Sequence, residues 1–134
     1  MAPSTFEAQL NSRLSMTASQ PYMPTFDALN EVARSLEVWL KSPSATHSAT
    51  VQVEPGFPAE LGQQFNVVVH IPDRHVSDTL FRAYVSPDGK AALDLFGEQP
   101  LYVAGKSELQ DEVLKFIDRP EVKSRLMIYK KLTE

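Results

Sequence analysis

The chain has 134 residues, of which 43% are hydrophobic and 22% charged, and it contains no cysteine. This composition is typical of an ordinary globular protein, and it excludes disulfides, thiolate chemistry and cysteine-based zinc sites. A formal net charge of −4 argues against non-specific nucleic-acid binding, which depends on cations that neutralise phosphates. The lack of cysteine suits a cytoplasmic protein, and no apolar run is long enough for a membrane helix.

The chain divides into an N-terminal arm, residues 1–23, and a single α+β domain, residues 24–134. Phe6, Leu10 and Leu14 recur every four residues in the arm, which predicts a short amphipathic helix. This helix could dock on the domain or bind a partner, and the docked arrangement is the one that we expect.

The first long helix is predicted to begin at Thr25. Apolar residues then recur at spacings of three and four and form one continuous face: Phe26, Leu29, Ala33, Leu36 and Leu40. Trp39 widens this apolar stripe near its end. We expect Trp39 to pack in the core; the alternative is an exposed anchor for a partner.

The middle of the chain predicts an antiparallel meander of four or five strands. Runs rich in Val, Leu, Phe and Tyr mark the strands, at Ala49–Val53, Phe65–Ile71, Thr79–Val85, Lys90–Phe96 and Leu101–Ala104. Ser86-Pro87-Asp88-Gly89 is a turn sequence, which predicts a hairpin there. Residues 54–58 contain two prolines and are predicted to be a turn or an irregular loop.

Strand alternation predicts which side of the sheet is buried. Phe65, Val67, Val69 and Ile71 share an apolar face, on which the helices should pack, while the other face stays partly open. Leu93 and Leu95 should be buried with them, as should Leu29, Leu36 and Phe116 from the helices. Arg82 and Asp94 should form a cross-strand ion pair on the open face.

The C-terminal third predicts a second helix and a further segment. Ser107 and Gln110 have capping-box spacing, with Ser107 as the N-cap. Asp118-Arg119-Pro120 interrupts the pattern, since Asp can cap a following turn and proline suits a first turn. We favour a helix for residues 121–132, with an edge strand as the alternative.

One cluster of ionisable residues, His70, Asp73, Arg74 and His75, is the candidate ligand-binding site. Two imidazoles and a carboxylate are the groups that ligate zinc or act in general acid–base catalysis. However, their spacing matches no known metal motif, and polar residues are ordinary in a loop between strands. We therefore expect no catalytic residue, no metal and no cofactor.

The C-terminal segment is basic within an acidic chain. From Lys115 onward there are six Lys or Arg residues and three Asp or Glu residues. Arg119, Lys123 and Lys130, at spacings of four and seven, could share one helical face and contact an acidic partner. The simpler interpretation, which we favour, is that these cations balance the acidic remainder of the chain.

The sequence favours a non-catalytic protein-binding module of adaptor, inhibitor-type or chaperone-like character, with another protein as its partner and self-association left open. The alternative is a small-molecule-binding domain or a small hydrolase with its site near His70, Asp73 and His75. No nucleic acid and no membrane are expected as partners.

Overall fold

The computed structural model describes residues 5–16, 23–59, 62–86, 88–97 and 99–134. These ranges hold four α-helices, five strands and a short 3-10 helix, η2, and the predicted α+β class is confirmed. In chain order they are α1 (Thr5–Met16), α2 (Met23–Leu40), β1 (Thr50–Ala59), β2 (Gly62–Ile71), η2 (Pro72–Arg74), β3 (Val76–Val85), β4 (Ala91–Asp94), β5 (Leu101–Val103), α3 (Lys106–Ile117) and α4 (Pro120–Leu132).

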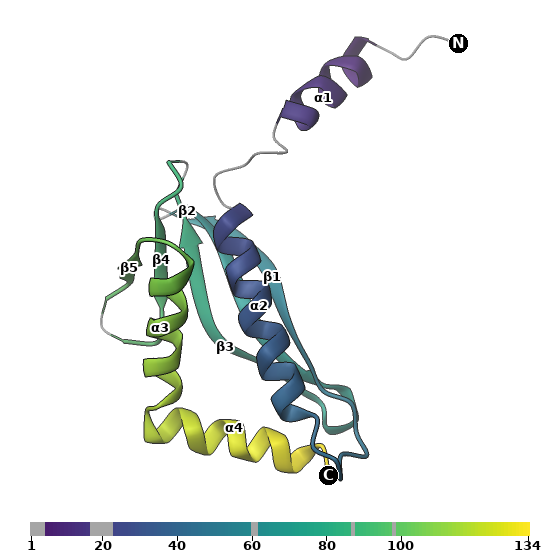
Figure 1. The fold of residues 1–134 in the computed structure, drawn as a ribbon. Helices are drawn as coiled ribbons and strands as arrows, with labels where there is room; N and C mark the ends of the chain where they lie inside the picture. Colours follow the sequence, from purple (N-terminus) through teal and green to yellow (C-terminus); the bar gives the residue numbers. More distant parts are fainter. Residues whose placement is uncertain (1–4, 17–22, 60–61, 87, 98) are drawn as a thin grey trace.

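The five strands form one antiparallel meander in the order β1-β2-β3-β4-β5 (Figure 1). The predicted hairpin joins β3 to β4: Val85 pairs with Ala91, and the Gly89 amide donates to the Ser86 carbonyl at 2.9 Å. Gly89 has φ of +85°, a conformation that glycine adopts without strain. Pro87, also part of the predicted turn, lies outside the described residues.

The first strand corrects the prediction for residues 54–58. β1 continues through Pro55, which pairs with Phe65, to Pro58, which pairs with Gln63, with a register shift between the two prolines. β1 lies at the edge of the sheet. An edge strand is hydrogen-bonded on one side only, so it accepts proline where a central strand would not.

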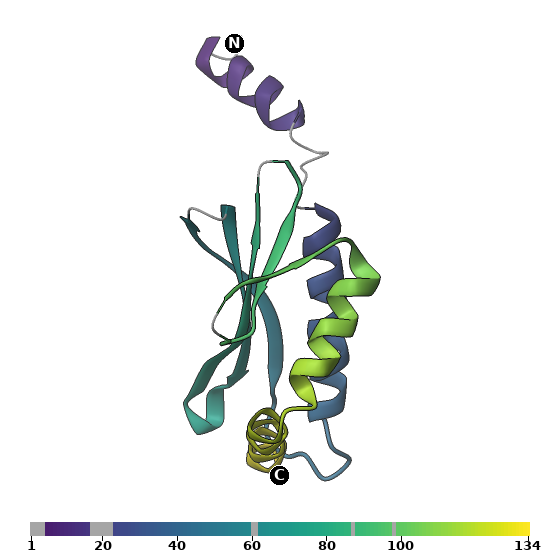
Figure 2. The ribbon, with the colours of Figure 1, turned by 90° about the vertical axis from the view of Figure 1, so that its left-hand side faces the viewer.

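The helices cover one face of the sheet. Figure 2 shows α2 and α3 on the same side, with α4 crossing at one end. The face that was predicted to be apolar is buried beneath them, including Val67, Val69 and Ile71. A register shift opposite Val67 and Val68 makes Leu80 an extra residue in β3, and both Leu80 and Phe81 are buried. Leu36 differs from the prediction, since it is only half-buried.

The other face of the sheet carries no helix among the described residues (Figure 2). Arg82 and Asp94 are opposite each other there, as predicted. The expected ion pair does not form: Asp94 accepts the Phe96 amide at 3.0 Å, and the Arg82 guanidinium lies 5.7 Å from the Phe96 ring centroid. Both side chains therefore interact with Phe96, in the turn after β4.

Both C-terminal helices begin without a side-chain cap. The N-cap of α3 is Gly105, so the predicted capping box at Ser107 is wrong. Glu108 instead accepts the Ala104 amide at 3.2 Å. For residues 121–132 the helix is confirmed and the edge strand is wrong: Pro120 occupies the first turn of α4, behind Arg119 as N-cap.

The N-terminal arm contains the predicted helix, α1, but its described apolar side chains are exposed. Phe6 is 74% exposed and Leu10 42%. Figure 1 shows α1 away from the sheet and the other helices. The docked arrangement that we expected is thus not seen. The division into an arm and one domain stays a prediction.

Candidate functional site

The residues of the predicted ligand site do not converge. The Asp73 carboxylate accepts a hydrogen bond from His47 Nδ1 at 2.9 Å, whereas His70 Nε2 contacts the Glu54 carboxylate at 2.8 Å on the sheet. Arg74 Nε donates to the Leu132 carbonyl at 3.1 Å. The predicted cluster is therefore divided among three separate contacts. Within the described ranges, no group of three metal-ligating side chains comes together.

His75 has a conformational role in this loop. Its φ of +56° is left-handed, and its amide donates to the Pro72 carbonyl at 3.0 Å, which ends η2. This geometry turns the chain from β2 into β3. Of the predicted cluster, His70, Asp73 and Arg74 thus contact neighbouring segments, and the backbone of His75 shapes the turn.

His70 forms a hydrogen-bonded row with Ser77 and Glu54, at 3.1 Å from Ser77 Oγ to Nδ1 and 2.8 Å from Nε2 to Glu54. The row contains the same groups as a serine hydrolase triad. However, the row also runs past Val68. Val68 and His70 lie on the same face of β2, and Glu54 pairs with Asn66, which is the next residue on that face beyond Val68. Val68 is buried, and none of the described helices lies on its face of the sheet. The strand register thus places the row beside a buried apolar residue on the open face.

The structure separates the predicted partner-binding cations. Arg119 precedes α4 and therefore does not share a helical face with the other two. Its guanidinium donates to the Leu95 carbonyl at 3.1 Å and lies 5.4 Å from the Phe116 ring centroid. Lys123 is exposed, 3.5 Å from Asp118. Lys130 Nζ lies 4.3 Å from the centroid of the Trp39 ring.

Trp39 is outside the core, so the expectation that it packs there is wrong. It is 39% exposed, while its neighbour Leu40 is fully buried. Successive helical residues are about 100° apart, so Trp39 is turned out of the stripe that ends at Leu40. Its ring forms part of the wall of two cavities between α2 and α4.

These two cavities meet at Trp39 and Met127, and we call them together the Trp39 groove. The first, of about 420 Å³, is lined by Leu36, Trp39, Ile117, Lys123, Leu126 and Met127. The second, of about 610 Å³, is lined by Trp39, Met127, Ile128, Lys130, Lys131 and Glu134. Met127 is 58% exposed and Ile128 59%. The groove is thus an exposed apolar surface bordered by lysines.

A third cavity extends the groove between α2 and α3. It has a volume of about 290 Å³ and shares Leu36 and Ile117 with the first. At its far end Glu31 pairs with Lys106 at 2.5 Å, and the hydrogen bond and charge of this lysine hold the pKa of Glu31 below its usual range. The charges at that end are therefore paired, whereas beside Trp39 Lys123 contacts Asp118 and Lys130 lies over the Trp39 ring.

A signal for this groove exists in the sequence, in the apolar run Leu126-Met127-Ile128-Tyr129. Four consecutive residues cover all sides of a helix, so they cannot all face one core. In α4, Leu126 and Tyr129 are buried, and Met127 and Ile128 face solvent. Neither Met127 nor Ile128 was among the predicted site residues.

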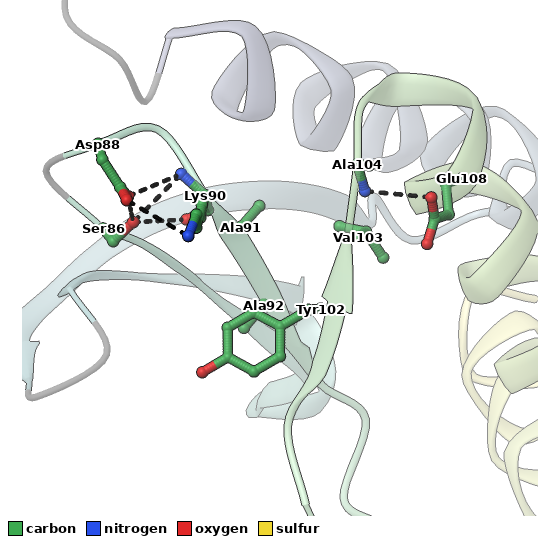
Figure 3. Close-up of a pocket in the computed structure, with 9 residues that line it drawn as sticks. All are labelled: Ser86, Asp88, Lys90, Ala91, Ala92, Tyr102, Val103, Ala104 and Glu108. Atoms are coloured by element: carbon green, nitrogen blue, oxygen red, sulfur yellow. Dashed lines mark hydrogen bonds and ion pairs between the residues drawn. The ribbon is translucent and has the colours of Figure 1, made fainter.

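Another cavity, of about 670 Å³, lies beside the β3–β4 turn (Figure 3). Its walls include Tyr102 and Ala92, while Ser86, Asp88 and Lys90 bond to one another at the turn. The Ser86 hydroxyl donates to the Asp88 carboxylate and holds its pKa below the usual range. The polar groups here serve the turn, so this cavity is a weaker candidate than the groove.

Comparison with protein-family models, with curated proteins and with solved structures gave no match for this chain. Among the residues that the structure describes, every helix is too short or too polar to cross a membrane.

Proposed function

We propose that this protein is a non-catalytic protein-binding module that holds a segment of another protein in the Trp39 groove. The observation that carries the proposal is the exposed apolar strip of Trp39, Met127 and Ile128. Buried apolar contacts supply most binding energy, and Trp and Met are enriched where proteins bind one another.

The groove has two properties that suit an adaptor or a chaperone-like protein. Methionine is unbranched and adapts to differently shaped partners. The lysines at the border keep the strip soluble and attract acidic partners from a distance. Binding to a second copy through the same groove would be a form of the same function, and the experiment below distinguishes it.

The proposal is tested by affinity capture with the full chain and two variants. Met127→Asp places a charge in the groove, and Tyr102→Asp places one at an equally exposed position on the sheet, 62% exposed. We expect a stoichiometric partner to be retained by the wild type and by Tyr102→Asp and lost by Met127→Asp. Identical captured proteins from all three would contradict the proposal.

Two controls accompany this comparison. Thermal unfolding should shift by no more than about 3 °C in either variant, since both side chains are exposed. Light scattering after size exclusion reports self-association: a wild-type dimer that Met127→Asp makes monomeric would identify a second copy as the partner.

The second candidate function is a small hydrolase, and the row Ser77, His70 and Glu54 is the observation that favours it. In that case Ser77 would act as nucleophile, His70 as base and Glu54 as the group that orients the imidazole. Ester hydrolysis that is abolished in Ser77→Ala would support this candidate. Equal activity in wild type and Ser77→Ala would exclude it.

A further inference from the structure

The groove and its extension follow α2 for about two helical turns. Glu31 lines one end and Trp39 the other, and eight residues of helix rise about 12 Å. The strip then continues over α4 to Ile128 and Lys131. The part along α2 therefore matches about two turns of a docked helix, and the part over α4 allows the helix to be longer.

The lining favours a helix over an added β-strand. All but one of the lining residues belong to α2, α3 and α4, whose backbone groups are bonded within their own helices. A peptide that binds as an added strand needs main-chain hydrogen bonds to a free strand edge, and helical walls offer none. An amphipathic helix satisfies its own backbone and needs only an apolar wall.

The charges along the strip are asymmetric. Lys123, Lys130 and Lys131 line the α4 end together with Glu134, and Lys123 also lies 3.5 Å from Asp118. At the α3 end the single lining carboxylate, Glu31, is paired with Lys106. The excess of positive charge at the α4 end therefore comes mainly from Lys130 and Lys131.

We infer that the occupant of the Trp39 groove is an amphipathic helix of a partner protein, with Asp or Glu beside its apolar stripe at the end that meets α4. This inference rests on the proposed function and adds the conformation and charge of the partner. The chain's own α1 fits less well: its Thr5–Met16 sequence holds one acidic residue, Glu7, and one basic residue, Arg13.

The test uses the full chain and two synthetic amphipathic 12-residue peptides that share one Leu and Ala stripe. One peptide carries Glu beside one end of the stripe, and the other carries Lys. The chain has a single tryptophan, Trp39, so its fluorescence reports directly on the groove. We expect the Glu peptide to shift the emission to the blue and to bind roughly tenfold more tightly than the Lys peptide at low salt. This ratio should shrink at 0.5 M salt.

Matched variants separate the local charge from the net charge. Lys123→Glu with Lys131→Glu removes groove lysines but keeps the contact of Lys130 with Trp39. Lys90→Glu with Lys115→Glu changes the net charge equally and leaves the groove lining intact. The first pair should reverse the peptide preference, and the second should preserve the preference of the wild type.

Three results would overturn the inference. Equal affinity for both peptides would show that charge does not select the partner. Failure of both peptides, while Met127→Asp still loses a captured protein, would show that the occupant is not a helix; the proposed function would survive. A red shift of Trp39 emission in Phe6→Asp without any peptide would identify α1 as the occupant.

Discussion

The two faces of α4 are built from neighbouring residues, but one face packs against the rest of the molecule and the other faces solvent. On the inner face, Val122, Leu126 and Tyr129 are buried in the core. Arg125 donates to Asp78 from Nε at 3.0 Å and from Nη2 at 2.5 Å, and to the Thr79 carbonyl at 3.0 Å. The inner face therefore fixes α4 to β3.

On the outer face, Met127 and Ile128 are as apolar as their buried neighbours but have been left in solvent. The difference shows that hydrophobicity alone does not identify a core residue, because the helical period decides which members of an apolar run face inward. Inner-face substitutions should lower the free energy of unfolding, whereas substitutions of Met127 and Ile128 should lower partner binding alone.

The largest effect is expected for Tyr129→Ala on the inner face. Tyr129 is 6% exposed, and its hydroxyl accepts a hydrogen bond from Arg125 Nε at 2.9 Å. Loss of the ring should lower the free energy of unfolding by about 3 kcal/mol, because a cavity remains. Urea denaturation followed by circular dichroism measures this change. A loss below about 1 kcal/mol would mean that α4 contributes little to the core.

A smaller loss is expected for Arg125→Met, which keeps much of the side-chain volume. The contacts with Asp78 and Thr79 are half-exposed, so their removal should cost about 1–2 kcal/mol in the free energy of unfolding. Lys123→Met on the exposed side is the control, with an expected change within about 0.5 kcal/mol. Equal losses in the free energy of unfolding for Arg125→Met and Lys123→Met would contradict the distinction between the two faces.

Lys130→Met tests the contact between Lys130 of α4 and Trp39 of α2. The ammonium of Lys130 lies 4.3 Å from the Trp39 ring centroid. A cation over an aromatic ring at a partly exposed site stabilises by about 0.5–1 kcal/mol, so a loss of that size is expected in urea denaturation. Lys131→Met is the matched control and should leave the stability unchanged. A stability gain in Lys130→Met would show that apolar contact with Trp39 outweighs the cation.

The smallest effect on stability is expected for the double variant Met127→Ser and Ile128→Ser. Both side chains are exposed, so the free energy of unfolding should change by less than about 0.5 kcal/mol for each substitution. Partner capture should nevertheless be lost. If stability fell by about 2 kcal/mol or more, the outer face would belong to the core after all.

The sequence predicted the fold where a local period or a turn determined the answer. The stripe from Leu29 to Leu40, the alternation in β2 and the Ser86–Gly89 turn all specify their structures through neighbouring residues. The structure agrees, except that Leu36 in the stripe is only half-buried. The strand through Pro55 was missed, because the position of β1 at the edge of the sheet is a property of the whole fold. The N-terminus of α3 was also predicted wrongly, because its N-cap is Gly105 and not Ser107.

The candidate site was less predictable than the fold. His70, Asp73 and Arg74 looked chemically promising in sequence, but each has a partner on a different element, and sequence spacing does not reveal partners 16, 26 or 58 residues away. Trp39 and Met127 are 88 positions apart in the chain and meet only because α4 crosses the end of α2. Lys123 and Lys130, two of the three cations considered for partner contact, do lie beside the groove, as does Trp39, whose exposure was the alternative to core packing.

The two prolines of β1 have a consequence for how chains of this protein can assemble. Fibrous aggregates grow in one dimension when a free strand edge adds the strand of another molecule. Pro55 and Pro58 each lack an amide, and the register shift between them bends that edge away from a regular ladder. At the opposite border β5 has only three residues. Replacing both prolines by valine would restore two backbone donors to β1. The free edge would then offer a more complete row of donors for a strand of another molecule, and the fibril growth that we expect is measurable as a thioflavin signal after agitation.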